Sequence, residues 1–188
     1  MANFLATWQL LPLKQIRNKC VVESDYLAEL KHRDEIFVSF VCLGNICRSP
    51  MAAAIFSNRV KDFTSPRAIV ESGGTSSWHI GEDAHLQSRN AWEAAGYSYS
   101  HRASQFSTLD LERLDLVLAM DSENFANIRA LARSEHDLKK IFLMRDFDNS
   151  IPPGASIPDP YSHEDQAYEH VRELLESAVA GLINAVWQ

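Results

Sequence analysis

The sequence predicts an α/β fold: a three-layer, doubly wound parallel sheet with helices on both faces. Apolar runs rich in β-branched residues alternate with amphipathic or alanine-rich runs along most of the chain, as in sheets wound from βα units. The first apolar run, residues 35–42, is almost continuous, which is typical of a parallel strand buried on both faces. The chain has 188 residues, 46% of them hydrophobic and 23% charged, which suits one domain with a sizeable core.

Each strand and helix has local signals of its own. Strands are expected in the runs EIFVSFVC, RAIVESGG, LDLVLAMD and KKIFLM, at residues 35–42, 67–74, 114–121 and 139–144. Helices are expected at residues 49–63, 83–97, 122–135 and 164–187. Ser49 should cap the first helix, and Pro50 suits its first position. Gly96 should end the second helix, and Asp121 or Ser122 should cap the third.

Charge and cysteine content exclude several classes of protein. The formal net charge is −7, so the basic footprint of a nucleic-acid binder is missing and no nucleic-acid partner is expected. The chain has three cysteines without the dense spacing of a disulfide scaffold, which favours a reducing, cytoplasmic location. The apolar stretch at residues 4–13 is too short to span a membrane and lacks the basic start of a secretory signal.

We divide the chain into a domain at residues 35–188 and an N-terminal extension of unknown role at residues 1–34. The extension contains Cys20 and a stretch, residues 21–35, that can form a short amphipathic helix. We expect it to pack on the domain or on a neighbour rather than on a membrane surface.

The turn after the first strand carries the main chemical signal, the run CLGNICR from Cys42 to Arg48. A lone C-x5-R occurs often by chance, but here a buried strand leads into it and a helix follows it. Gly44 and Asn45 suit the left-handed conformations that a tight loop needs. Such a loop turns backbone N–H groups inward and cradles a tetrahedral dianion such as phosphate. Arg48 can hold two phosphate oxygens, and would help to stabilise Cys42 as a thiolate nucleophile.

A second signal lies in the proline-rich loop at residues 146–162, in the run IPDPY. A phosphomonoester needs a proton donor for its leaving oxygen, and Asp159 stands between Pro158 and Pro160, which stiffen the loop. Tyr161 follows, and an aromatic ring at a pocket rim can stack on a flat substrate. Taken alone, the run would indicate an ordinary Asp-Pro turn.

The strand, the run VCLGNICRSP, the helix after it and the DPY run before the last helix together resemble the low-molecular-weight protein tyrosine phosphatases. The resemblance covers residues 35–188 and implies a flavodoxin-like strand order, with the phosphate-binding loop after the first strand. It also implies a hydrolase of phosphotyrosine-containing proteins, monomeric or weakly dimeric, that needs no cofactor and no metal. Cys42 would form a phosphocysteine, Arg48 would clamp the phosphate, and Asp159 would act as general acid and then base.

The same resemblance implies supporting roles around the loop. Ser49 matches the position whose hydroxyl hydrogen-bonds the cysteine sulfur, and Asn45 matches the residue that holds the loop in its strained shape. Ser72 is placed near Asn45, and His101 joins the same buried network. Asp121 supports the loop or caps the next helix. The loop itself consists of Leu43, Gly44, Asn45, Ile46 and Cys47.

Two further predictions concern the pocket rim and the second cysteine of the loop. Trp78 matches an aromatic wall position and would form, with Tyr161, a slot that favours phosphotyrosine over the shorter phosphoserine. Ser162 stands where some members have a second aromatic residue. Cys47 is either a small side chain packed under the loop or a redox partner that forms a disulfide with oxidised Cys42.

Other functions are compatible with parts of the pattern. A related arsenate reductase would need further cysteines, and none follows Cys47. A phosphatase of this fold for small aryl phosphates or phosphoarginine is a closer alternative, although phosphoarginine enzymes resembling this loop carry Thr where Ile46 stands. A non-catalytic phosphotyrosine-binding module would be expected to lack Cys42, Arg48 or Asp159, and all three are present.

Overall fold

The computed structural model describes residues 24–188 and contains one parallel sheet with the strand order β2-β1-β3-β4. The strands are β1 (Glu35–Cys42), β2 (Arg67–Gly74), β3 (Leu116–Ala119) and β4 (Ile141–Leu143). All the predicted strands are therefore present, and their order is the flavodoxin-like one. The register pairs Cys42 with Gly74, so β1 and β2 end together at the edge where the predicted phosphate loop begins.

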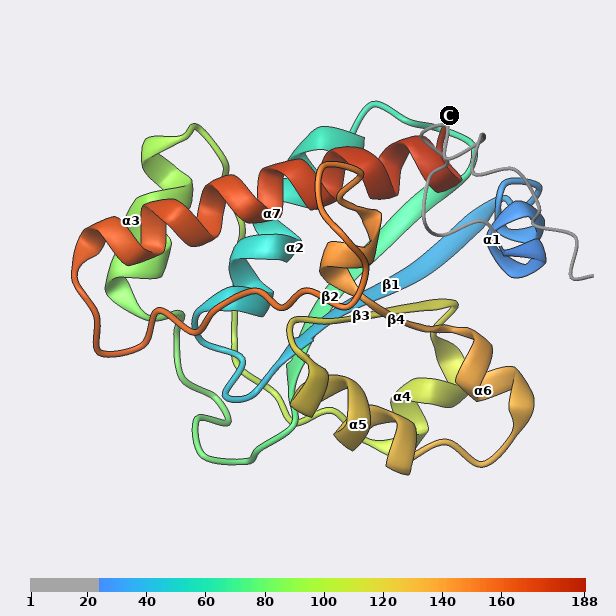
Figure 1. Cartoon of the computed structure of the whole chain (residues 1–188), viewed down its shortest axis with the longest axis horizontal. Coiled ribbons are helices and arrows are strands. Elements are labelled where there is room, and N and C mark those ends of the chain that lie inside the picture. The colour runs from blue at the N-terminus through green and yellow to red at the C-terminus, as the bar shows by residue number, and fades with distance from the viewer. Residues whose placement is uncertain (1–23) are drawn as a thin grey trace, which may run out of the picture.

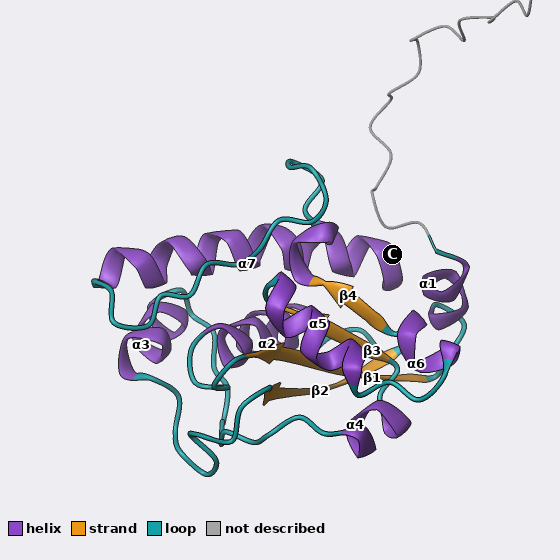
Figure 2. Ribbon diagram, turned by 60° about the horizontal axis from the view of Figure 1, so that its bottom comes forward, coloured by secondary structure: helices purple, strands orange, loops and turns teal. Residues whose placement is uncertain are grey.

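Helices cover both faces of the sheet, as predicted (Figures 1 and 2). One face carries α2 (Arg48–Val60), α3 (Leu86–Ala94) and α7 (Asp165–Val186). The other face carries α4 (Thr108–Arg113) and α5 (Ser122–Ala130), with α6 (Glu135–Lys139) near the start of β4. The chain also forms α1 (Asp25–Leu30) and the 3-10 helix η1 (Met144–Phe147).

The side chains of β1 alternate between two hydrophobic layers, which explains why the strand is apolar almost throughout, with Ser39 as a buried exception. Val38 and Phe40 face the larger layer, under α2 and α7, whereas Phe37 and Val41 face the smaller layer, under α4 and α5. A parallel strand buried on both faces needs apolar side chains on both, which is the pattern in the sequence. The carboxyl end of this buried strand gives the functional loop a rigid base.

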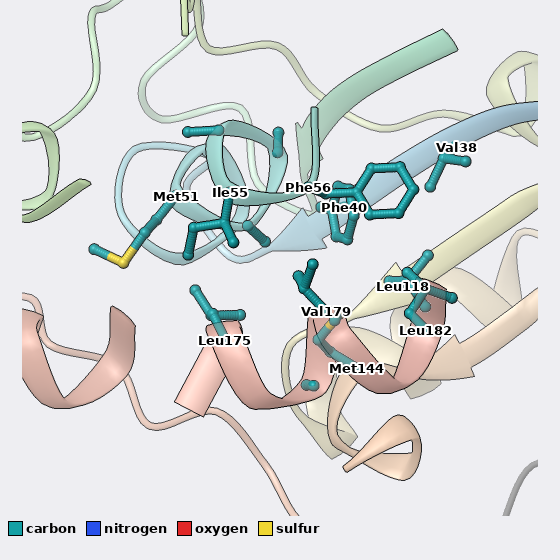
Figure 3. Packing of buried hydrophobic residues seen from close by; sticks show 14 of the residues in the cluster. Val38, Phe40, Met51, Ile55, Phe56, Leu118, Met144, Leu175, Val179 and Leu182 are labelled. Atoms are coloured by element: carbon teal, nitrogen blue, oxygen red, sulfur yellow. The ribbon is translucent and has the colours of Figure 1, made fainter. Parts of the chain in front are cut away.

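The larger layer fixes α2, the helix that follows the loop. Figure 3 shows Ile55 of α2 pointing toward Leu175 and Val179 of α7, and all three are completely buried. Phe40 of β1 packs on Phe56 of α2, with ring centroids 5.4 Å apart. Burying each such side chain stabilises the fold by about 1.5–3 kcal/mol, so α2 has a tightly defined position above β1.

The helix α1, within the predicted N-terminal extension, packs on the domain core. Its first turn is capped by Ser24, whose side chain accepts a hydrogen bond from the Leu27 N–H at 3.2 Å. The Tyr26 hydroxyl donates to the Asp115 carbonyl at 2.7 Å, and Leu30 is completely buried. Cys20 and the apolar stretch at residues 4–13 lie outside the described residues. None of the helices in residues 24–188 is both long and apolar enough to cross a membrane.

Several local expectations were wrong. Ser49 does not cap α2: the helix begins at Arg48, Cys47 is its N-cap residue, and the Ser49 hydroxyl turns to the catalytic loop instead. The six-residue helix α4 was not predicted, because it is too short to show a clear period. The predicted helix at residues 122–135 breaks after α5, and Ser134 caps the separate helix α6. Asp121, rather than Ser122, caps α5.

Candidate active site

The loop between β1 and α2 is held against the end of β2. The Thr75 N–H donates to the Cys42 carbonyl at 2.8 Å, and the Ser76 N–H donates to the Leu43 carbonyl at 2.9 Å. Gly74 allows this approach, because a Cβ atom there would lie 2.8 Å from the Leu43 oxygen. The carbonyl oxygens of Cys42 and Leu43 thus accept hydrogen bonds from the residues that follow β2.

Asn45 is the centre of the loop's hydrogen-bond network. Its φ of 57° lies in the left-handed region, which asparagine tolerates better than most residues. Its side-chain NH2 donates to the hydroxyls of Ser49 and Ser72, both at 2.9 Å, and its side-chain oxygen accepts from the Ser104 N–H at 2.9 Å. His101 Nε2 lies 2.7 Å from the Asn45 carbonyl oxygen. These bonds hold a strained residue in one conformation.

Gly44 contributes close packing rather than an unusual backbone angle. Of the two loop residues expected in the left-handed region, only Asn45 adopts it. A Cβ atom at Gly44 would lie 2.9 Å from Cδ2 of His79, so the missing side chain lets the His79 ring approach the loop. The Nδ1 atom of His79 lies 2.9 Å from Oε2 of Glu82.

The sulfur of Cys42 lies at the floor of this loop and is surrounded by hydrogen-bond donors. The Asn45 N–H donates to it at 3.2 Å, and the Ser49 hydroxyl lies 3.0 Å away. Cys42 is 2% exposed, and α2 begins six residues later with its N-terminus toward the loop. Both the donors and the helix dipole favour negative charge at this sulfur.

Arg48 is held in place by carboxylates from two distant loops. Its Nη1 donates to Asp121 at 2.6 Å and to the Ile157 carbonyl at 3.1 Å, and its Nη2 donates to Asp159 at 2.8 Å. Burial alone would lower the pKa of Arg48, but Cys42, Asp159 and Asp121 outweigh it and raise that pKa. The guanidinium therefore stays charged. Within residues 24–188, its buried Nε has no hydrogen-bond partner, and an oxyanion in the loop would supply one.

Cys47 lies beneath the loop and is 4% exposed. Burial raises its pKa to about 12, and the nearby Cys42 acts in the same direction. The positive charge of Arg48 partly opposes this shift. Cys47 is therefore a thiol at neutral pH.

A pocket of about 200 Å³ opens above the loop. The predicted catalytic and rim residues line it: Cys42, Arg48, Asp159, Trp78 and Tyr161, together with Leu43, Gly44, Ile46 and Cys47. The floor is buried, whereas the side walls are exposed, with Trp78 71% and Tyr161 51% accessible. A buried polar floor under aromatic walls suits a ligand with an anionic head and a flat apolar body.

The structure thus brings together every predicted site residue, with Ser72 and His101 behind the loop. Sequence reasoning missed His79, which also lines the pocket, although its position next to Trp78 was a usable signal. It also missed Tyr168 and His85, which contact each other at 3.0 Å. These two are 83 positions apart in the chain, and no sequence pattern links them.

The buried His101 should make stability depend on pH. Burial lowers its pKa, although the hydrogen bond to the Asn45 carbonyl opposes that shift. Below about pH 6.5, the unfolded chain therefore binds a proton at His101 more readily than the folded protein does. His101 favours folding above about pH 6.5, the ordinary histidine value, and this contribution is lost as pH falls toward the folded pKa. We expect His101→Gln to flatten the decline in unfolding free energy between pH 7.5 and 5.5.

Urea unfolding at several pH values would check this, with about 1.4 kcal/mol expected for each unit by which the pKa is lowered. His32→Gln, at an exposed position, is the control and should keep the wild-type slope. An unchanged slope in His101→Gln would contradict the assignment of a buried, neutral imidazole.

The family model for low molecular weight phosphotyrosine protein phosphatases matches residues 37–188. The chain is 40% identical over 151 residues to a low molecular weight protein-tyrosine-phosphatase of Streptomyces coelicolor, which covers 79% of this chain and 92% of the relative. This protein therefore belongs to the low molecular weight phosphotyrosine protein phosphatase family, whose members are phosphoric monoester hydrolases.

Solved structures support the same assignment. A protein tyrosine phosphatase from Entamoeba histolytica aligns with a TM-score of 0.74 at 32% identity, covering 79% of this chain and 95% of that one. An arginine phosphatase from Geobacillus stearothermophilus aligns with a TM-score of 0.69 at 29% identity, covering 79% and 91%. The fold thus occurs both in a protein tyrosine phosphatase and in an arginine phosphatase.

Proposed function

We propose that this phosphatase hydrolyses phosphotyrosine in proteins through a phosphocysteine intermediate. One observation carries the proposal: the Cys42 sulfur, the Arg48 guanidinium and the Asp159 carboxylate line one pocket whose walls are Trp78 and Tyr161. The pocket combines a nucleophile, a cation and a proton donor, which are the groups that metal-free hydrolysis of a phosphomonoester requires.

In the first step, Cys42 attacks phosphorus and the aryl oxygen leaves. The inward N–H groups of the loop and the Arg48 fork bind the equatorial oxygens, whose charge is spread in the transition state. Because Asp121 and the Ile157 carbonyl hold Nη1, the guanidinium keeps its position when Nη2 exchanges Asp159 for phosphate. Asp159, freed from that bond and protonated, gives its proton to the leaving oxygen.

In the second step, water attacks the phosphocysteine and inorganic phosphate leaves. Asp159, now a carboxylate, accepts a proton from this water, and the sulfur departs as a thiolate. The Ser49 hydroxyl, 3.0 Å from the sulfur, stabilises the departing thiolate by hydrogen bonding. Asn45 positions this hydroxyl through its own bond to Ser49, so the network behind the loop serves both steps.

The walls favour a phosphorylated aromatic side chain. The nucleophile is buried and the aromatic rings above it are exposed, an arrangement that favours the longer stem of phosphotyrosine over that of phosphoserine. The Geobacillus arginine phosphatase makes phosphoarginine the main alternative. Ile46 lies in the pocket lining and presents an apolar surface, which suits an aryl ring better than a guanidinium.

Turnover of matched peptides containing phosphotyrosine, phosphoserine or phosphoarginine at the same position tests the proposal. We expect phosphotyrosine to be hydrolysed with the highest kcat/KM, with no loss of activity in chelator and competitive inhibition by vanadate. A higher kcat/KM for phosphoarginine would overturn the substrate assignment while leaving the phosphatase mechanism intact.

We also propose that Cys47 protects the nucleophile from irreversible oxidation. Peroxide converts the Cys42 thiolate to a sulfenic acid; the Cys47 thiol then condenses with it, forming a disulfide and releasing water, and added thiol reduces the disulfide. After peroxide and then dithiothreitol, wild type should recover most of its activity, and Cys47→Ala should recover much less. Equal recovery would leave Cys47 as a packing residue only.

A further inference from the structure

His85 links the phosphate loop to the last helix, although it does not itself line the pocket. It is the N-cap residue of α3, and its backbone N–H donates to the Ile46 carbonyl of the loop at 2.8 Å. Its Nδ1 atom lies 3.0 Å from the Tyr168 hydroxyl of α7. The backbone of His85 is thus fixed by the phosphate loop, and its side chain is fixed by α7.

The His85 ring lies between two tyrosine rings. Its plane is parallel to that of Tyr168, at an angle of 4° with a centroid distance of 5.5 Å, and the Nδ1 atom faces the Tyr168 hydroxyl. Tyr161 meets it edge to face, at an angle of 64° and the same centroid distance of 5.5 Å. Tyr168 is 1% exposed, whereas Tyr161 is 51% exposed, so the stack runs from the core to the pocket wall.

The Tyr161 ring is held less firmly than a buried side chain. Half of the residue is in solvent, and the next residue, Ser162, has a φ of 66°, in the left-handed region. Its backbone N–H bonds to Oδ1 of Asp159 at 3.2 Å, which fixes the turn but leaves the ring free to rotate about χ1. The edge-to-face contact with His85 is what restricts that rotation.

We propose that His85 is a positioning residue that holds Tyr161 as a rigid wall and so sets the preference of this enzyme for aryl phosphates. The proposal rests on the aryl-phosphate preference proposed above. Because His85 acts through Tyr161, it should affect the aryl part of a ligand and not the phosphate part. An aromatic edge-to-face pair contributes enough to change affinity about two- to tenfold.

Equilibrium binding of two probes separates the contribution of the aryl part of a ligand from that of the phosphate part, and it does not require turnover. Calorimetry would compare an aryl phosphonate with inorganic phosphate in wild type, His85→Ala, His85→Phe, His85→Gln, Tyr161→Ala and the double variant His85→Ala/Tyr161→Ala. Thermal unfolding of each variant shows that it is folded, and His85→Phe keeps a ring in the stack if the smaller side chains weaken the fold.

We expect His85→Ala and His85→Gln to weaken the aryl phosphonate about two- to tenfold, with inorganic phosphate changed less than about twofold. His85→Phe should bind like wild type, and the double variant should bind like Tyr161→Ala alone. Additive losses in the double variant, or rescue by Gln but not Phe, would overturn the proposal. Equal affinity of wild type for both probes would instead overturn the aryl preference itself.

Discussion

Replacing Cys42 with serine should abolish hydrolysis of phosphotyrosine, lowering kcat by roughly four orders of magnitude or more. Serine preserves the size and position of the side chain, but its hydroxyl is far less acidic than a thiol and cannot act as the nucleophile. The donors around the sulfur, from Asn45 and Ser49, would stabilise a thiolate and do not remove a proton from an alcohol. Steady-state kinetics with a phosphotyrosine peptide would measure the loss.

Two controls make this result specific. Cys47→Ser, in the same loop, should keep most of its turnover, because Cys47 is a buried thiol with a pKa of about 12. Cys42→Ser itself should still bind inorganic phosphate, since the loop N–H groups and Arg48 remain. Wild-type rates in Cys42→Ser would show that the phosphocysteine mechanism is wrong, and lost phosphate binding would show that the loop had changed shape.

Replacing Asp159 with alanine should lower kcat for a phosphotyrosine peptide by about 10²- to 10⁴-fold, the usual contribution of a general acid or base. The loss should be much smaller for 4-nitrophenyl phosphate when the first step limits the rate, because its leaving group needs little protonation. Asp121 still holds Arg48 in this variant, so KM should not rise. Comparison of the two substrates measures the effect.

Glu164→Ala is a matched control, because this exposed carboxylate lies five positions away and makes no capping hydrogen bond at the start of α7. It should behave like wild type with both substrates. If Asp159→Ala lost the same factor in kcat/KM, which reports formation of the phosphocysteine alone, with the peptide and with 4-nitrophenyl phosphate, Asp159 would not be protonating the leaving group.

The parts of the site that are local in sequence were the easiest to predict. Cys42 and Arg48 are brought together by one strand end, one loop and one helix start, each with its own signal. Asp159 lies 111 positions from Arg48, and only the resemblance to a family placed it in the pocket. The stack of Tyr161, His85 and Tyr168 was not predictable, because it depends on side-chain rotamers from three separate segments.

The fold shows the same division between local and long-range causes. Periodicity located the sheet, because burial on two faces demands continuous apolar strands. The preference of serine for helix caps was misleading at Ser49, which is the second residue of α2. There the hydroxyl bonds to Cys42 and accepts from Asn45, contacts that no helix propensity describes. Local preference was overridden where the chain makes its functional contacts.

The segment that carries Trp78 is anchored at both ends by backbone hydrogen bonds. The Ser76 N–H bonds to the Leu43 carbonyl, and the Gly81 N–H bonds to the Ala103 carbonyl at 2.8 Å. Between these anchors, the side chains of Trp78 and Ile80 are mostly in solvent. Trp78 and Ile80 are therefore natural positions for a directed-evolution library aimed at new phosphoproteins, whereas His79 should be kept, because its ring packs closely against Gly44 of the catalytic loop.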